Sequence, residues 1–328
     1  MRANPGHLPH RRLAATLAIS AVLLPGLSTA QVGKPITIVI STGPGASNDL
    51  ETRMYGSKLT ELTGTQVIAD YKPGAGTTIA AAYVARSVPD GYTLLGISSS
   101  FTAAAALYSS LPYDPIKDFS PVSLMSKRTT VLVVHPSAPF KTVQEYVSYT
   151  KAHPGEINVA TVGAGSGPHI NAVWLHMLAN TKVTFVHYKS ASGMQADLLG
   201  GRVHMTYGSL LTALPHLKSG KLRLLALGNA ERSPLMPEAR TVAEQGLPGY
   251  DYSSMYGLLA PGGTPQPIVS RLNAEFVKVA KSADIIKRLE AEGGLAVGST
   301  SQAFGQLIAT EIGRYRKIVS EAGIKPND

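Results

Sequence analysis

The chain has 328 residues and no cysteine, and its 30 Lys and Arg outnumber its 21 Asp and Glu. The absence of cysteine excludes disulfides, thiolate nucleophiles and Cys-ligated metals. The positive charge is not gathered into a Lys/Arg cluster, so it favours anionic small solutes over nucleic acid as ligands. The length suits two compact lobes.

The first 30 residues have the pattern of a secretory signal peptide. Arg2, Arg11 and Arg12 precede the apolar residues 13–27, and the small residues Ser28-Thr29-Ala30 follow. The apolar run is shorter than the about 20 residues of a membrane-spanning helix. We therefore expect cleavage near Ala30 and export to the periplasm, since no cysteine is present to carry a lipid anchor.

The remaining chain repeats a unit of strand, loop and helix. The first unit is a β-branched strand at 36–40, the loop Ser41-Thr42-Gly43-Pro44-Gly45 and a helix that starts near Asn48. Glu51 follows Asn48 by three residues, as in a capping box. Further strands are expected at 67–71, 92–97, 131–134, 159–162, 183–188, 205–207 and 222–227, with helices at 77–88, 101–108, 142–153, 169–178, 194–199, 267–281, 283–292 and 302–322.

This alternation predicts an α/β architecture with parallel sheets. A turn-rich connector at 111–115 interrupts the alternation of strands and helices. The apolar strands at 131–134 and 222–227 are candidates for the segments that pass from one lobe to the other. We therefore expect a second lobe, residues 131–225, inserted into a first lobe made of residues 31–130 and 226–328. Ligands of such sheets bind at the carboxyl ends of the strands, so the cleft between the lobes is the expected site.

Four loops at these strand ends, residues 41–48, 98–100, 163–167 and 190–193, are rich in Gly, Ser and Thr. Glycine lets the backbone approach a ligand, and a helix N-terminus offers unpaired N–H groups and partial positive charge. Together the loops predict an anion site built from neutral donors. The alternative for each loop alone is a tight turn. Asp49, in a first helical turn, either complements the helix dipole, orders its loop or holds a ligand group through water.

Sharper motifs are absent from these loops. They lack the Lys-Ser/Thr pair of a P-loop and the third glycine of a dinucleotide fingerprint. Ser166 lacks the G-x-S-x-G spacing because Ala164 and Pro168 occupy the glycine positions. A hydrolase using Ser166, His169 and Asp197 stays the less favoured alternative, and the scattered histidines give no reason to expect a metal or another cofactor.

Ordered motifs along nearly the whole mature chain resemble a known family. They include Pro44-Gly45 with Asp49, Lys72-Pro73-Gly74-Ala75-Gly76, Pro89-Asp90-Gly91-Tyr92-Thr93, Lys117-Asp118-Phe119-Ser120-Pro121, Gly163-Ala164-Gly165-Ser166 with His169, and Asp197-Leu198-Leu199-Gly200-Gly201. With these residues the sequence resembles the Bug-type periplasmic solute-binding receptors of tripartite tricarboxylate transporters.

The resemblance implies a two-lobed periplasmic binding protein of the type II Venus-flytrap class, without catalysis. It also implies that loops 42–49 and 163–166, with His169, hold a ligand carboxylate, partly through ordered waters. The implied partner is a membrane permease with one large and one small subunit, and we expect the receptor to be monomeric. Its role is expected to be the capture of an organic carboxylate and its delivery to that transporter. A ligand-sensing receptor for a signalling partner is the alternative.

The chain departs from the family pattern at several of these loops. Ser41-Thr42 replaces Pro-Phe, Gly45-Ala46 and Gly76-Thr77 each replace Gly-Gly, and Ser190 replaces Gly. We hypothesise a polar carboxylate ligand, such as an aromatic or short aliphatic dicarboxylate. The residues expected to bind it are Ser41, Thr42, Gly45, Ala46, Ser47, Asn48, Asp49, Ser98, Gly163, Ala164, Gly165, Ser166, His169, Ser190 and Ser209.

Overall fold

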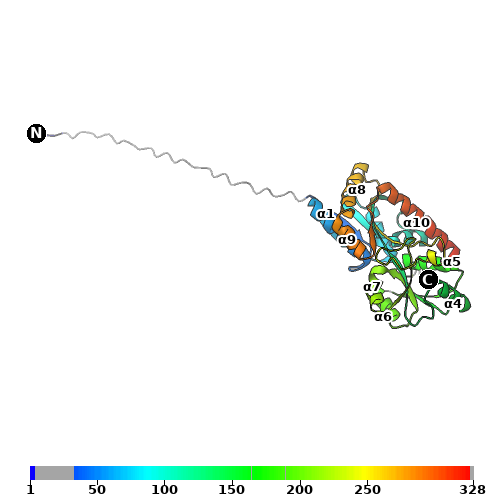
Figure 1. Ribbon diagram of the computed structural model, residues 1–328. Helices are drawn as coiled ribbons and strands as arrows, with labels where there is room; N and C mark the ends of the chain where they lie inside the picture. The colour runs from blue at the N-terminus through cyan, green and yellow to red at the C-terminus, as the bar shows by residue number, and fades with distance from the viewer. Residues whose placement is uncertain (4–32, 164, 189, 326–328) are drawn as a thin grey trace. The chain divides into compact units, whose positions relative to one another are not determined.

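Two mixed β-sheets covered by helices form the part of the chain that follows residue 32 (Figure 1). The computed structural model describes residues 1–3, 33–163, 165–188 and 190–325. The expected signal peptide therefore falls, apart from its first three residues, outside the described residues, as do Ala164 and Lys189.

The first sheet has six strands. Their order across the sheet is β11 (Gly294–Ala296), β4 (Phe119–Arg128), β10 (Ser254–Pro261), β3 (Thr93–Ser98), β1 (Ile36–Ile40) and β2 (Val67–Tyr71). Strand β1 is parallel to both of its neighbours, whereas β10 is antiparallel to β3 and β4. The accompanying helices are α1 (Ser47–Thr63), η1 (Ala75–Thr77), α2 (Thr78–Ala85), α3 (Ser99–Leu107), α8 (Gln266–Ala280), α9 (Ala283–Ala291) and α10 (Ser301–Ala322).

The second sheet has five strands, in the order β7 (Thr184–Tyr188), β6 (Asn158–Val162), β8 (Met205–Ser209), β5 (Thr130–Val134) and β9 (Arg223–Leu227). Strand β6 is parallel to β7 and β8, and β5 is antiparallel to β8 and β9. Its helices are α4 (Val143–Ala152), α5 (Gly167–Ala179), α6 (Ala191–Leu199), α7 (Leu210–Lys218) and the short η2 (Ala243–Gln245).

The expectation of parallel sheets holds only in part, because both sheets also contain antiparallel pairs. The residue patterns of β4 and β10 carry no clear strand signal. Pro121 and several polar residues break the apolar pattern of β4, and Gly257 interrupts β10. The two strands form a long antiparallel pair with two register shifts, so each is specified by its partner more than by its own periodicity.

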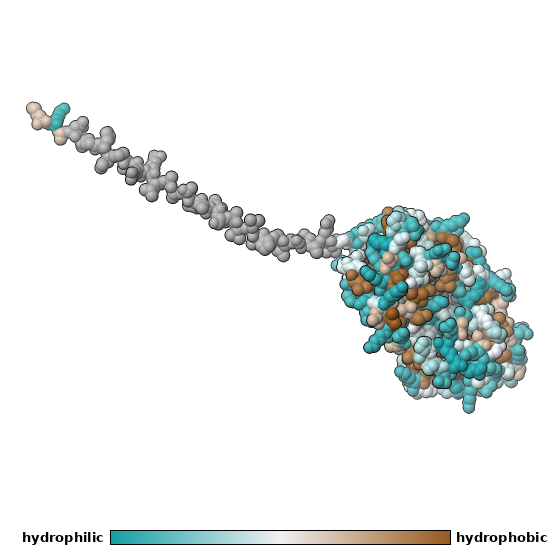
Figure 2. Space-filling model, turned by 45° about the horizontal axis from the view of Figure 1, so that its top comes forward, coloured by the Kyte–Doolittle hydropathy of each residue, from teal (hydrophilic) through white to brown (hydrophobic). Residues whose placement is uncertain are grey.

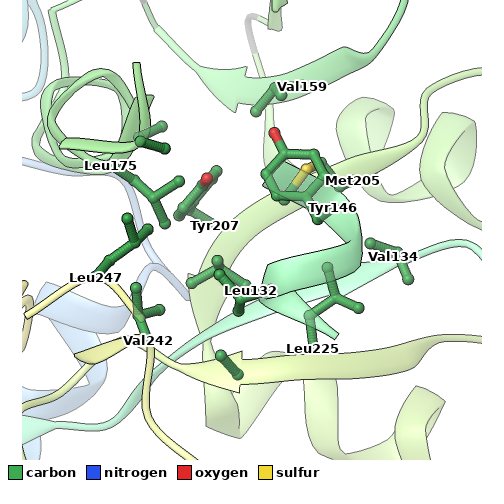
Figure 3. Packing of buried hydrophobic residues seen from close by; sticks show 14 of the residues in the cluster. Leu132, Val134, Tyr146, Val159, Leu175, Met205, Tyr207, Leu225, Val242 and Leu247 are labelled. Carbon is green, nitrogen blue, oxygen red and sulfur yellow. The ribbon is translucent and has the colours of Figure 1, made fainter. Parts of the chain in front are cut away.

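The second lobe is inserted into the first, as expected. All strands of the second sheet lie between β4 and β10 in the sequence, and Thr129 alone joins β4 to β5. The return segment after β9 packs on the second sheet, where Val242 and Leu247 join its core (Figure 3). Tyr250 belongs to the same cluster. The exact domain boundaries given above stay a prediction.

Helix α5 connects the two halves of the molecule. On one side Ala172 and Leu175 pack in the core of the second sheet. On the other side Ile170 packs with Ala103 of α3 and Tyr315 of α10, both helices of the first sheet. The start of α5 is therefore held between the lobes.

The outer surface mixes hydrophilic and apolar patches on the face shown in Figure 2. Among the described helices, none combines the length and the apolar character needed to cross a bilayer.

Candidate ligand-binding cleft

A cavity of about 500 Å³ lies where loops of the two sheets meet. The first sheet contributes the turn 75–77 and residues of α3, and the second contributes the ends of β6 and β7 with the loop before α5. The volume lies within the range of about 300–1,000 Å³ usual for small-molecule sites. Its lining residues are Ala75, Gly76, Thr77, Ser100, Ala104, Leu107, Tyr108, Val162, Gly163, Gly165, Ser166, His187 and Tyr188.

The loop before α5 forms one wall of this cavity. Gly165 has a φ of +69°, and its N–H donates to Nδ1 of His169 over 2.9 Å. A Cβ at Gly165 would lie 1.9 Å from a methyl group of Leu107, so only glycine lets this loop approach α3 so closely. His169 is buried, and its ring contacts those of Phe185 and His187. Its structural role is to fix the loop.

The loop before α1 is fixed in the same way, by a hydrogen bond from a glycine N–H to the side chain four residues later. Gly45 has a φ of +82°, and its N–H donates to Oδ2 of Asp49 over 2.7 Å. The other oxygen, Oδ1, accepts the hydroxyl of Tyr71 at 2.7 Å, so both carboxylate oxygens are used within the protein. Asn48 donates to the carbonyl of Gly96 on β3 over 3.0 Å. These contacts favour the reading in which Asp49 orders its loop.

Four of the serines expected to face a ligand are helix caps. The Oγ atoms of Ser98, Ser166, Ser190 and Ser209 accept the backbone N–H of Ser100, His169, Gly193 and Leu211, respectively. Each satisfies one of the unpaired N–H groups at the start of α3, α5, α6 or α7. Each serine Oγ therefore already accepts a hydrogen bond from its helix, which reduces its capacity to accept one from a ligand.

Helix α1 lacks such a cap. Its N-cap residue is Ala46, which has the extended backbone usual for that position, φ −70° and ψ 155°, but no side-chain oxygen. The capping box expected from Asn48 and Glu51 is wrong, because the helix starts at Ser47 and Glu51 turns to other partners. The first N–H groups of α1 are thus left without a side-chain acceptor.

Glu51 instead forms a buried charge network behind α1. Its Oε1 pairs with Nε of Arg128, and its Oε2 accepts the hydroxyl of Ser126 at 2.8 Å. Nη2 of Arg128 also binds Glu292 at 2.8 Å. Burial raises the pKa of the Glu51 carboxyl, and Arg128 opposes that shift. The network joins α1 to the last residue of β4, next to the crossing at Thr129.

The structure separates the expected site residues into groups. Gly163, Gly165 and Ser166 line the large cavity, whereas residues 41–49 are not part of its lining. Ser47 and Ser209 line a smaller cavity of about 40 Å³ with Glu51 and Arg128. Ser98 and Ser190 cap helices, and Ala164 lies outside the described residues. Ser41, Asn48 and Asp49 are buried, with Asn48 bonded to Ser41 at 3.4 Å.

The expectations missed the wall formed by residues 75–77, together with Ser100, Leu107, Tyr108, Val162, His187 and Tyr188. A signal for part of it was present: the motif Lys72-Pro73-Gly74-Ala75-Gly76 and the unusual Thr77. The loop follows β2, which pairs with β1 so that Tyr71 lies beside Ile40. Both loops therefore leave the same edge of the first sheet.

The contacts of Asp197 disfavour a Ser-His-Asp hydrolase. Its Oδ2 accepts the hydroxyl of Tyr188, and its Oδ1 accepts Nε of Arg202, each at 2.7 Å. Ser166 Oγ binds the backbone of His169, whose Nδ1 is taken by Gly165. In the described part of the chain, no group of three or more His, Asp or Glu side chains is placed to hold a metal ion.

Comparison with known proteins identifies the family. Residues 52–324 match the family described as "Tripartite tricarboxylate transporter family receptor". The chain belongs to this family of receptors. BugT of Bordetella pertussis is 30% identical over 311 residues, which is 94% of this receptor and 95% of BugT.

Two solved structures share the fold and about a third of the sequence. Rpa4515 of R. palustris, solved with adipate, is 32% identical with a TM-score of 0.81, covering 89% of this receptor and 98% of that chain. MatC of Rhodopseudomonas palustris, solved with malate, is 31% identical with a TM-score of 0.77, covering 87% and 98%. Both of those proteins were therefore solved with a dicarboxylate.

Proposed function

We propose that this receptor is exported to the periplasm, closes over an organic carboxylate and delivers it to a tripartite membrane permease with one large and one small subunit. Family membership and the two relatives solved with dicarboxylates support the class of ligand. A signal peptide cleaved near Ala30 and a monomeric receptor belong to the same proposal.

The observation that carries the proposal is the uncapped N-terminus of α1. Of the helices that follow parallel strands, α3, α5, α6 and α7 have serine caps. Helices α1 and α2, with Ala46 and Thr77 at their N-cap positions, have no side-chain cap. An uncapped helix start offers N–H donors and partial positive charge. A carboxylate of the ligand would take the place of the missing cap.

The loop before α1 is ordered without using these donors. Asp49 binds Gly45 and Tyr71, and Asn48 binds Gly96, so the backbone keeps its shape when no ligand is bound. Such preorganisation lowers the entropy that binding must overcome. Thr42 adds a buried hydroxyl that has no partner in the protein and lies in the same loop.

A melting screen of the mature protein against mono- and dicarboxylates, sugars and amines tests the proposal. A carboxylate at 100 times its Kd should stabilise the fold by about 2.7 kcal/mol. If sugars or amines raise the melting temperature and no carboxylate does, the proposed ligand class is wrong. Uptake by membranes carrying the permease subunits, with and without the receptor, tests the delivery step.

The substitution Ala46→Ser tests the place of the carboxylate. A serine cap should stabilise the free protein by about 1 kcal/mol and compete with the ligand, lowering affinity about fivefold. Ala46→Gly, which adds no hydroxyl, is the matched control and should keep the affinity. Unchanged binding in Ala46→Ser would place the carboxylate elsewhere.

A further inference from the structure

The turn formed by residues 74–77 has an unusual backbone. Gly74, Ala75, Gly76 and Thr77 all have positive φ, with Thr77 at +85°. A β-branched residue in this region is a genuine outlier, because its side chain collides with its own backbone. Strain of this kind collects at ligand sites, where the surrounding structure holds it in place.

The hydroxyl of Thr77 has no partner in the protein. The side chain is 9% exposed, and its Oγ1 is buried without a hydrogen bond. Thr77 is the N-cap residue of α2, yet it does not cap that helix, because its left-handed backbone turns the hydroxyl away from the first turn. A buried hydroxyl without a partner is costly, so it calls for a partner from outside the chain.

Thr77 lines the large cavity together with the loop that precedes α5. Ser100 lies on the same first-sheet side, and Gly163 and Ser166 lie on the second-sheet side. The cavity wall between them is apolar at Ala104 and Leu107. A ligand with an apolar middle and an oxygen-bearing end fits this arrangement of groups.

The turn also lies next to the proposed carboxylate position at α1. Strands β1 and β2 are parallel neighbours, and Lys72 N–H donates to the carbonyl of Ile40. Neighbouring strands are about 4.8 Å apart, a distance on the scale of a short dicarboxylate. The loops that lead to α1 and to Thr77 therefore start side by side at one edge of the first sheet.

Resting on the proposed function, we propose that Thr77 is a specificity-determining residue whose hydroxyl donates to the second carboxylate of a dicarboxylate ligand. The first carboxylate lies at the N-terminus of α1. Thr77 thereby makes this receptor select dicarboxylates over monocarboxylates with the same carbon skeleton. The positive φ of Thr77 sets the direction of its side chain, which lies in the wall of the cavity.

The test is isothermal titration of the mature protein with matched acids: succinate and butyrate, adipate and hexanoate, terephthalate and benzoate. For the tightest dicarboxylate, Thr77→Val should lower affinity at least about tenfold and leave the matched monocarboxylate unchanged. Thr77→Ser should stay within about threefold of wild type. Thr78→Val, which removes the neighbouring hydroxyl bonded to Ala75, is the control and should keep the ratio.

The substitution Thr77→Gly distinguishes a role of Thr77 in ligand binding from a role in the structure alone. It should raise the melting temperature of the free protein, because glycine adopts positive φ without strain, while weakening dicarboxylate binding as Thr77→Val does. Equal loss of mono- and dicarboxylate binding in Thr77→Val, or an unchanged ratio, would overturn the inference. Binding of monocarboxylates without any dicarboxylate would also overturn it and leave the proposed function standing. No binding of any carboxylate would mean that the proposed function itself is wrong.

Discussion

The loops that precede α1 and α5 are built alike but end differently. In each, a glycine N–H donates to a side chain four residues later, Gly45 to Asp49 and Gly165 to His169. At the N-cap of α5, the side chain of Ser166 accepts a backbone N–H of the first helical turn. At the N-cap of α1, Ala46 has no side chain that can do so. We therefore place the proposed anion site at the start of α1, which lacks a cap, rather than at a loop rich in serine.

The two helices are also anchored differently. Helix α1 is fixed by charge, through Glu51, Arg128 and Glu292. Helix α5 is fixed by neutral groups. Nδ2 of Asn171 donates to the carbonyl oxygen of Gly167 at 2.7 Å and to the hydroxyl oxygen of Tyr315 at 2.8 Å. Removing one partner of a buried ion pair lowers the stability of the fold more than removing a neutral partner, because a buried charge is left without a counter-charge.

The largest expected effect is therefore at Arg128. Arg128→Met leaves the buried Glu51 without its cation and should lower the free energy of unfolding by about 3–5 kcal/mol. Tyr315→Phe, which removes one neutral anchor of α5, should cost only about 1 kcal/mol. Urea unfolding measures both. The double variant Glu51→Gln with Arg128→Met should be less destabilised than Arg128→Met alone; an equal or larger loss would contradict the charge argument.

The next largest effect is expected at Asp49 and His169, the side chains that accept the glycine N–H in the two loops. Asp49→Asn removes a buried charge that accepts two hydrogen bonds and should cost about 1.5–3 kcal/mol. It should also weaken carboxylate binding, because the loop before α1 loses its order. His169→Asn keeps an acceptor near the position of Nδ1 and should disturb binding less. Calorimetric titration and urea unfolding of both variants check this order, and a larger binding defect in His169→Asn would reverse it.

Acid should weaken the core around α5 through His176. Burial lowers the pKa of this histidine to about 3, and the neutral ring bonds Tyr146 at 3.1 Å and Thr181 at 2.8 Å. Below the unfolded pKa of about 6.5, only the unfolded chain takes up the proton. Stability is therefore full above that pH and falls towards the folded pKa.

The loss from His176 should be roughly 2 kcal/mol between pH 6.5 and pH 4.5. Urea unfolding at several pH values measures it, with His176→Gln as the variant that removes this titration. The variant should be less stable at pH 7 but less sensitive to acid. Parallel pH curves for the two proteins would show that His176 is not the source.

The smallest effect concerns the cap itself. Ser166→Ala should lower the free energy of unfolding by about 1 kcal/mol, the usual cost of removing a serine cap. Ala46→Ser should change it by a similar amount in the opposite direction. Thermal unfolding of the ligand-free proteins measures both. A stabilised Ser166→Ala protein would mean that the start of α5 is satisfied in some other way.

Much of the fold follows from the sequence. The helices of the tail, expected at 267–281, 283–292 and 302–322, lie at 266–280, 283–291 and 301–322. Their apolar residues recur at helical spacing, which local chemistry decides. Strands β4 and β10 were missed because their pairing depends on residues more than a hundred positions apart.

The sequence by itself determined the family, the α/β units and the loops at the strand ends, because these depend on local patterns and ordered motifs. Only the tertiary structure decided what each side chain does there. It assigned Ser98, Ser166, Ser190 and Ser209 to caps, gave Glu51 to Arg128, and set Thr77 with an unpartnered hydroxyl in the cavity wall. The physical reason is that a hydroxyl or carboxylate binds whichever partner the fold brings within reach, and no local pattern records that partner.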